Sequence, residues 1–396
     1  MLFVASQFPA YDETFLMREM AAVREAGLDI EIFSLKSCRD KIVHRQASEL
    51  EVVTFYAPFF SPKIIWANLC MLLAKPVAFL ALLWWLLAHC WSKPLLLLKS
   101  LALFPKSVFV ARQLQHRQIK HVHALWATHP ATAGVIMRRL GGGEVTFSFT
   151  GHAHDIYLDT TMLKDKMAIA EFVMTCTNDN KKYLAQFGKD EKIRVSYHGL
   201  DVAKYQPAEP EVTSEINIIS VGSLLECKGF EYLIDAVGLL KESNNKVRCT
   251  IVGGGMLEDS LKRRARDRGV AGEVVFTGYV KQEDMPRYYQ QAGVFVLPAI
   301  PEIHWGIPNV LLEAMACGVP ILVTALPSIV EILQAGDVGD YIEERSAKSI
   351  AQKAQHILGD AEACRNMGLT ARQKILRDFD IRKNGQRLAG WFQEYM

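Results

Sequence analysis

Short apolar runs alternate with helical patterns along most of this chain, and this alternation limits its fold more than any other feature. It is the signature of βαβ units, which assemble into parallel sheets. Two series of such runs occur, and they predict an α/β protein. The expected strands are Leu2–Ala5, Asp29–Leu35, His121–Leu125, Val145–Thr150 and Val173–Thr177 in the first series, and Ile216–Val221, Val247–Val252, Val274–Phe276, Val294–Leu297 and Pro320–Val323 in the second.

The length of the chain and a Pro-containing segment between the two series predict the domain organisation. A chain of 396 residues exceeds what one hydrophobic core usually serves, so two domains are expected. A final helix from about Ser346, broken near Asp378, ends in aromatic residues that we expect to dock back on the first domain. The expected boundaries are 1–204 for the N-terminal domain, 205–214 for a linker, 215–375 for the C-terminal domain and 376–396 for the returning helix.

Neither the N-terminus nor the cysteines indicate export. Met1–Pro9 has no basic segment and no long apolar stretch, so it predicts a buried strand and not a secretion signal. The eight cysteines are scattered and include no Cys-x-x-Cys pair, which favours a reducing compartment and argues against a structural zinc site. The net charge of +2 gives no reason to expect a nucleic-acid partner.

The stretch Val52–Gly143 differs from the rest because it contains no Asp or Glu but ten Lys or Arg. Its most apolar part, residues 76–92, is 17 residues long, at the short edge of a membrane span, and its Trp residues suit a membrane interface. Basic charge beside apolar surface attracts anionic lipid by about 1 kcal/mol per Lys or Arg. Three alternatives remain open for the insertion at about 60–110, in this order: monotopic membrane contact, a helical hairpin packed on the domain, and a true span. The tryptophans are Trp84, Trp85 and Trp91.

The strongest candidate for chemistry is the segment Gly306–Pro320. Pro308 stands where a helix should begin, and Gly318 stands where it should end. The helix between them is nearly all apolar and therefore buried, so the carboxylate of Glu313 must be paired or hydrogen-bonded. Two partners explain it equally well: a ribose diol, or a Lys or Arg in a structural salt bridge. The helix N-terminus also offers free N–H groups to a diphosphate.

Five segments of the chain match, in order, the motifs of one enzyme family. The chain resembles glycosyltransferase family 4, the Glu-x7-Glu group, over nearly its whole length. The resemblance implies the GT-B fold, with two Rossmann-like, doubly wound parallel-sheet domains that face a cleft. The matching segments are Phe8–Glu19, Thr150–Asp155, Val221–Phe230, Ile251–Gly255 with Phe276–Val280, and Gly306–Pro320.

By this resemblance, the C-terminal domain binds a nucleotide-sugar donor, UDP- or GDP-linked. Glu313 would bind the ribose, and backbone groups near Val280 would hold the base. Lys228, which follows a strand and a Gly-containing loop, would be catalytic by stabilising the leaving diphosphate. Without the resemblance, Lys228 would be an ordinary exposed lysine and the glycines a tight turn. The other expected donor-binding residues are Gly222, Ser223, Gly253, Gly254, Gly306, Ile307, Pro308 and Asn309.

The N-terminal domain would bind the acceptor and supply a catalytic histidine. His152 follows an expected strand at its carboxyl end, where doubly wound sheets bind ligands. The family's Thr-x-His pattern implies that His152 contacts the donor sugar and steadies the transition state. The alternative is a hydrogen-bonded loop histidine. His121 and His123 share one face of a strand, and we interpret them as structural. Further contacts to donor sugar or acceptor are expected from His154, Asp155, Trp305, Glu13 and Thr14.

Two positions depart from the family pattern. Trp305 stands eight residues before Glu313, where the family has a carboxylate, which affects how the donor sugar is held. Ser223 stands where the family usually has Arg, so Lys228 and the helix dipole must carry the phosphate charge. No metal is expected, because the one Asp-x-Asp, Asp378–Asp380, lies by a helix break far from any candidate site.

The resemblance implies a retaining glycosyltransferase of the exopolysaccharide or colanic-acid type. It would need no cofactor, and it would transfer a sugar to a lipid-linked or oligosaccharide acceptor at the cytoplasmic face of the cell membrane. Two alternatives remain open. One is a metal-dependent hydrolase that uses His121-x-His123 and His152-x-His154, since such pairs can bind zinc. The other is a catalytically inactive, membrane-associated GT-B-like subunit, which would explain Trp305 and Ser223.

Overall fold

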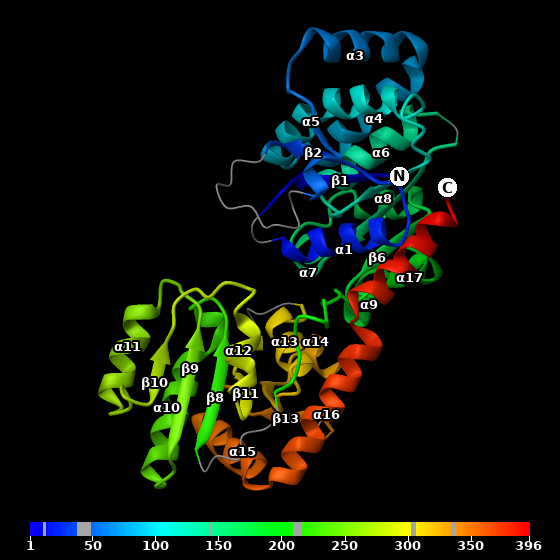
Figure 1. The fold of residues 1–396 in the computed structure, drawn as a ribbon. Helices are drawn as coiled ribbons and strands as arrows, with labels where there is room; N and C mark the ends of the chain where they lie inside the picture. Colours follow the sequence, from blue (N-terminus) through cyan, green and yellow to red (C-terminus); the bar gives the residue numbers. More distant parts are fainter. Residues whose placement is uncertain (11–12, 38–48, 143, 209–214, 302–305, 334–336) are drawn as a thin grey trace. The chain divides into compact units, whose positions relative to one another are not determined.

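The computed structural model describes residues 1–396 except 11–12, 38–48, 143, 209–214, 302–305 and 334–336 (Figure 1). The chain folds into two compact units. Unit 1 comprises Met1–Gly199 and Ile381–Met396, and unit 2 comprises Leu200–Asp380.

The segment that follows Gly199 belongs to unit 2, so unit 1 ends earlier than residue 204. The N–H of Leu200 donates to the carbonyl of Phe379 at 2.7 Å, and Leu200 forms a parallel bridge with Asp380. The ring of Tyr205 is buried in unit 2, and its carbonyl accepts a hydrogen bond from the Arg372 guanidinium. The expected linker therefore begins inside the fold of unit 2, and its residues 209–214 lie outside the described residues.

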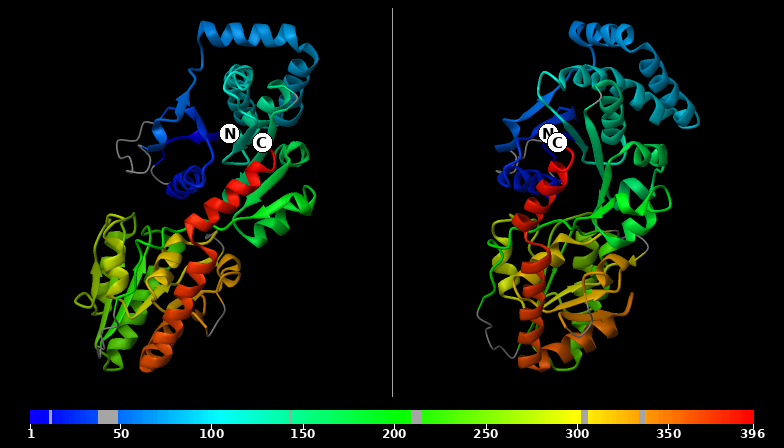
Figure 2. Two further views of the ribbon diagram at one scale, coloured as in Figure 1. Left: turned by 45° about the vertical axis from the view of Figure 1, so that its right-hand side comes forward. Right: turned by 90° about the vertical axis from the view of Figure 1, so that its right-hand side faces the viewer.

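Unit 1 contains a seven-stranded parallel sheet in the order β3-β2-β1-β4-β5-β6-β7. Leu2 and Val4 of β1 face one hydrophobic cluster, and Phe3 and Ala5 face another, so helices cover both faces of the sheet (Figure 2). The strands are β1 (Leu2–Gln7), β2 (Glu31–Lys36), β3 (Thr54–Tyr56), β4 (His121–Ala124), β5 (Thr146–Gly151), β6 (Phe172–Thr175) and β7 (Ile193–Val195). The helices are α1 (Thr14–Glu25), α3 (Pro62–Ala74), α4 (Pro76–Cys90), α5 (Pro94–Gln113), α6 (His129–Leu140), α7 (Ala153–Tyr157), α8 (Leu163–Ile169), α9 (Asn178–Leu184) and α17 (Ile381–Gln393).

Unit 2 contains a six-stranded parallel sheet in the order β10-β9-β8-β11-β12-β13. The two parallel sheets confirm the predicted α/β class with two Rossmann-like domains. The strands are β8 (Ile216–Val221), β9 (Val247–Val252), β10 (Val274–Phe276), β11 (Val294–Leu297), β12 (Ile321–Thr324) and β13 (Gly339–Ile342). The helices are α10 (Phe230–Glu242), α11 (Glu258–Asp267), α12 (Met285–Gln290), α13 (Asn309–Ala316), α14 (Pro327–Val330), α15 (Ala347–Gly359) and α16 (Ala361–Asp378).

The three strands that the sequence did not predict were missed for one physical reason. The strands β3, β7 and β13 each lie at the edge of a sheet and have three or four residues, so they lack a long apolar run. The C-terminal helical segment has one more break than expected. The side chain of Asp360 accepts hydrogen bonds from the N–H groups of Glu362 and Ala363 and thereby starts α16 as a separate helix.

The last helix, α17, packs against α1 within unit 1. Phe392 is fully buried, and its ring lies 5.7 Å from that of Phe3 and 4.9 Å from that of His123. The aromatic end of the chain therefore forms part of one hydrophobic cluster of unit 1.

The insertion expected at about 60–110, within the acid-free stretch, forms three helices, α3, α4 and α5. Among the described residues, one helix, α5, is long and apolar enough to cross a membrane. The pair α3 and α4 is bent by 112° at its break, and it would be a second candidate only if the two helices formed a single span. The expected segment 76–92 corresponds to α4, which has only 15 residues. Of the most apolar 18-residue part of α5, 44 % is buried within the protein. The helix packs against α3 and α6, so part of its apolar surface belongs to the core of unit 1.

Candidate active site

In unit 1, the loop after β5 carries His152 and is held in place by Asp155. The carboxylate of Asp155 accepts hydrogen bonds from the backbone N–H of His152, at 2.7 Å, and from that of Ala127. Burial raises the pKa of Asp155 to about 7, and these hydrogen bonds act in the opposite direction. Asp155 therefore positions His152 through the backbone of the loop.

The imidazole of His152 is buried among other rings. Its centroid lies 4.6 Å from that of Trp126, 5.3 Å from that of Phe15 and 5.3 Å from that of His198. Burial lowers the pKa of His152 to about 4, against the effect of a hydrogen bond to the backbone of Leu125. At neutral pH this ring is uncharged, so it can act on a sugar through a hydrogen bond but not through a positive charge.

A pocket of about 320 Å³ lies beside this loop, and its wall combines carboxylates with an indole ring. It brings together three of the expected contact residues, Glu13, His154 and Asp155. Thr14 lies outside the wall, and its hydroxyl accepts a hydrogen bond from Arg18 at 3.4 Å. The wall consists of Ser6, Glu13, Trp126, Thr128, His154, Asp155, Leu158 and Asp159.

His121 and His123 of β4 are bound to hydroxyl groups of β5. The two ring nitrogens of His121 lie 2.7 Å from the hydroxyls of Thr146 and Ser148, and those of His123 lie 2.7 and 2.9 Å from the hydroxyls of Ser148 and Thr150. Both nitrogens of each buried ring are therefore in use, and these two histidines are structural. The hydrolase alternative loses two of its four zinc ligands.

In unit 2, the loop between β8 and α10 holds Lys228 against a glycine. A Cβ at Gly222 would lie 3.4 Å from Cε of Lys228, so the lysine stem passes over this glycine. Gly229 has a φ of +64°, and a Cβ there would lie 2.0 Å from the carbonyl oxygen of Pro298. Burial lowers the pKa of the Lys228 amine. Ser223 is exposed in the same loop.

The loop after β9 contains Gly253 and Gly254, and its neighbours lie so close that no side chain fits at either position. A Cβ at Gly253, whose φ is +134°, would lie 2.1 Å from the carbonyl oxygen of Gly222, and one at Gly254 would lie 2.6 Å from the ring of Tyr279. The next residue, Val280, lines a pocket of about 530 Å³. This pocket lies where the base of a nucleotide is expected. Its wall consists of Thr277, Tyr279, Val280, Lys281, Asp284, Arg287, Tyr288 and Gln291.

The helix α13 begins after Pro308 and buries Glu313, whose exposure is only 6 %. The hydroxyl of Tyr289 donates a hydrogen bond to Oε2 of Glu313 at 3.0 Å. A tyrosine hydroxyl is thus one partner of this carboxylate, which the sequence did not predict. At the start of α13, Gly306, Ile307 and Asn309 are partly exposed, while Trp305 lies outside the described residues.

Three residues at these sites were missed in the sequence: Cys176, His198 and Tyr289. Cys176 and His198 follow β6 and β7, as His152 follows β5, and these three strands are neighbours in the sheet. Cys176 lies near the carboxyl end of the predicted strand Val173–Thr177, and this position was the signal that could have found it. The strand before His198 is a three-residue edge strand, so it gave no such signal.

Comparison with known proteins identifies relatives by sequence. Residues 201–374 match the family model of glycosyl transferases group 1. The chain is 26 % identical over 280 residues to a GDP-mannose-dependent alpha-(1-6)-phosphatidylinositol monomannoside mannosyltransferase of Mycolicibacterium smegmatis, covering 65 % of this chain and 72 % of the relative. It is 30 % identical over 208 residues to the colanic acid biosynthesis glycosyltransferase WcaL of Escherichia coli, covering 51 % of each. It is also 30 % identical over 204 residues to the amylovoran biosynthesis glycosyltransferase AmsK of Erwinia amylovora, covering 50 % of each.

Solved structures extend the likeness in fold to the whole chain. HepE of Anabaena in complex with UDP superimposes with a TM-score of 0.73 at 16 % identity, covering 99 % of both chains. The lipopolysaccharide outer core galactosyltransferase WaaB superimposes with a TM-score of 0.70 at 14 % identity, again covering 99 % of both. At these identities the comparison establishes the fold and not the substrate.

Proposed function

We propose that this chain is a glycosyltransferase, and that it transfers a sugar from a UDP- or GDP-linked donor to a lipid-linked saccharide, with retention of configuration, in bacterial polysaccharide biosynthesis. The names of the relatives support the class of donor and the pathway. HepE was solved with UDP and with UDP-glucose, and the mycobacterial relative is named as GDP-mannose-dependent. WcaL and AmsK are named for the biosynthesis of two polysaccharides.

The observation that carries the proposal is the burial of Glu313 on α13. A carboxylate has about four lone-pair sites, so Glu313 can accept from the Tyr289 hydroxyl and from the two hydroxyls of a ribose at the same time. A salt bridge to Lys or Arg was the other explanation for this buried carboxylate, and the Tyr289 hydroxyl is a neutral partner that accounts for part of its hydrogen bonding. We therefore assign Glu313 to the ribose of the donor.

The diphosphate of the donor would bind at the loop of Lys228. Its ammonium group offers charge to the leaving group, and Gly222 and Gly253 let the backbone approach closely. The start of α13 adds N–H donors and a positive helix end. Together these groups would carry the charge of the leaving nucleotide, so the proposed reaction requires no metal.

His152 would serve the donor sugar as a neutral hydrogen-bonding group. Its loop is fixed by Asp155, and its ring is uncharged at neutral pH because burial lowers its pKa to about 4. A fixed neutral group of this kind stabilises charge that develops on a sugar by orientation, with little reorganisation during the reaction.

The insertion in unit 1 would bind the cytoplasmic face of the cell membrane. In α3, the exposed Ile65, Leu69 and Leu73 recur every four residues and form one apolar stripe. In α4, Trp84 is 70 % exposed, whereas the indole N–H of Trp85 donates to Asp165 at 2.9 Å and so holds α4 on unit 1. The exposed large apolar residues of this region are Phe59, Phe60, Ile65, Trp66, Leu69, Leu73, Val77, Leu80, Trp84, Trp91, Leu95 and Leu98.

Two experiments test the proposal. Incubation of the purified protein with UDP- and GDP-sugars and a lipid-linked saccharide extract should release UDP or GDP and extend the lipid-linked saccharide, as seen by mass spectrometry. Binding of nucleotide sugar without turnover would instead indicate a non-catalytic subunit.

The second experiment is a vesicle flotation assay. The protein should bind anionic vesicles, and it should be released partly by salt and fully by alkaline carbonate. Resistance to both would indicate a true span, and no vesicle binding would indicate a packed hairpin.

A further inference from the structure

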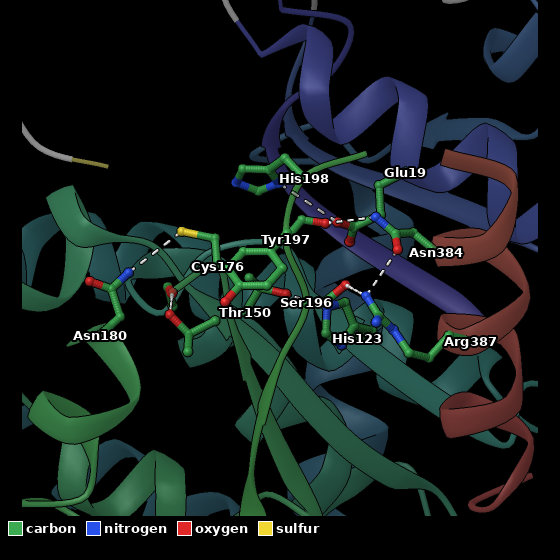
Figure 3. A network of polar contacts seen from close by, with 12 residues as sticks. Glu19, His123, Thr150, Cys176, Asn180, Ser196, Tyr197, His198, Asn384 and Arg387 are labelled. Carbon is green, nitrogen blue, oxygen red and sulfur yellow. Dashed lines mark hydrogen bonds and ion pairs between the residues drawn. The ribbon is translucent and has the colours of Figure 1, made fainter. Parts of the chain in front are cut away.

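Three metal-ligating side chains meet where β5, β6 and β7 end. His152, Cys176 and His198 each offer one ligand atom, and these atoms lie within 4.8 Å of one another. The three strands are adjacent and parallel, so the residues that follow them share one edge of the sheet; Figure 3 shows two of them, Cys176 and His198. In a tetrahedral zinc site the ligand atoms lie about 3.3–3.6 Å apart. Shifts of about 1 Å at the side chains would therefore bring this group to that spacing.

The imidazole of His152 presents a nitrogen atom that lacks a hydrogen-bond partner. Nε2 of His152 is buried and makes no hydrogen bond within the described residues. The hydrogen bond of the His152 ring to the backbone of Leu125 engages its other nitrogen, which leaves the lone pair on Nε2. A buried polar atom without a partner is costly, by about 1–3 kcal/mol, so such atoms commonly indicate a missing ligand.

Further polar side chains surround these ligands, as outer partners do in metal sites. The amide of Asn180 donates to Sγ of Cys176 at 3.5 Å, and Oε2 of Glu19 lies 4.0 Å from Nδ1 of His198 (Figure 3). The loop that carries His198 is anchored by α17, because the amide of Asn384 donates to the carbonyl of Tyr197 at 3.0 Å. The ligands are thus held by α1, α9 and α17 of the same unit.

We propose that His152, Cys176 and His198 form a zinc site with an open fourth position, and that bound Zn²⁺ inhibits sugar transfer because it occupies the lone pair of His152. A thiolate with two imidazoles selects Zn²⁺ over Mg²⁺, Mn²⁺ and Ca²⁺, which prefer oxygen ligands. On binding, the S–H bond of Cys176 breaks, a Zn–S bond forms and the proton goes to the buffer. The inhibition rests on the proposed function, whereas the metal binding does not.

The competing explanation is that the rings of His152, His198, Phe15 and Trp126 only pack against one another. Binding of Co²⁺ to tag-free, chelator-treated protein separates the two, because a cobalt–thiolate bond absorbs in the near ultraviolet. We expect one Co²⁺ per chain with this absorption, displacement by Zn²⁺ but not by Mg²⁺, and release of one proton per Zn²⁺ in calorimetry. A folded wild-type protein without the cobalt–thiolate absorption would overturn the proposal.

Substitutions of the proposed ligands test whether these side chains bind the metal. Cys176→Ser should lose the absorption, bind Zn²⁺ at least tenfold more weakly, and retain a larger fraction of its own metal-free turnover than wild type when Zn²⁺ is added. Cys90→Ser is the matched control, because Cys90 is a buried thiol of unit 1 outside the cluster, and it should behave as wild type. If Cys176→Ser does not fold, His198→Gln provides the same binding test. Unchanged Zn²⁺ affinity in either folded variant would overturn the proposal, and Zn²⁺ binding by a protein without transfer activity would count against the proposed function alone.

Discussion

Both units are built on parallel sheets, but they hold their buried polar side chains in different places. In unit 1 the buried histidines are neutral and lie on strands or at strand ends, such as His121 and His152, and this unit also buries charged groups such as Lys166. In unit 2 the buried carboxylates lie on helices: Glu313 bound by Tyr289, and Asp235 of α10 in a salt bridge with Arg264. The difference suggests a division of labour. Under the two proposals, unit 2 would provide fixed charge for a nucleotide, whereas the interior of unit 1 would change state with pH and with metal ions.

Removing one candidate catalytic residue from each unit should have the largest effect. Lys228→Ala and His152→Ala should fold and should each lower turnover roughly 10²–10³-fold, the usual cost of one preorganised group at a transition state. Only Lys228→Ala should also weaken the binding of UDP or GDP, because it removes positive charge at the diphosphate. The binding of the nucleoside alone should barely change. Steady-state kinetics and calorimetry measure the two effects.

The matched controls are Lys241→Ala in unit 2 and His356→Ala on an exposed face of α15. Both should turn over as wild type. If His152→Ala lost nucleotide affinity, the assignment of unit 1 to the sugar and unit 2 to the nucleotide would be wrong.

The sequence was sufficient to predict those features of the structure that depend on residues close together in the chain. Pro308 and Gly318 fixed the ends of α13, and the apolar helix between them required that Glu313 be buried. It could not place Cys176 beside His198, because their proximity depends on the order of β5, β6 and β7 in the sheet. It also could not show which tryptophan of α4 faces solvent, since that depends on the bond between Trp85 and Asp165.

Acid should weaken unit 1 through its buried histidines. Burial lowers the pKa of His121 from 6.5 to about 3, so the unfolded chain binds a proton that the folded chain does not, and stability falls as the pH drops below 6.5. Between pH 7.5 and 5 this one group should cost about 2 kcal/mol. Hydrogen exchange of the β4 and β5 amides should therefore show that His121→Gln loses less stability over this range than wild type.

The matched variant in unit 2 is His356→Gln, which should leave the pH dependence of β8 and β9 unchanged because His356 is exposed. An identical pH dependence in His121→Gln and wild type would mean that His121 is not neutral in the folded protein.

A smaller effect is expected at the membrane, where, among the described residues, the exposed apolar side chains are concentrated in unit 1. Leu73→Asp in α3 should lower the partition to anionic vesicles about tenfold or more, since burial of a leucine side chain contributes roughly 1.5–3 kcal/mol. Leu369→Asp is the control, because Leu369 is an exposed leucine of α16 in unit 2. Flotation with the two variants measures the difference, and equal loss in both would remove α3 from the contact.

The central claim is that unit 2 binds the ribose of a nucleotide through Glu313, and a double-mutant cycle by calorimetry tests it most directly. Glu313→Gln keeps an acceptor for Tyr289 but removes the charge, so it should weaken UDP or GDP by roughly 1.5–3 kcal/mol. The 2′-deoxy nucleotide should bind wild type more weakly, but its loss should be much smaller in Glu313→Gln, because both changes remove the same interaction. Nucleotide affinity that is unchanged in folded Glu313→Gln, or losses that simply add, would contradict the account.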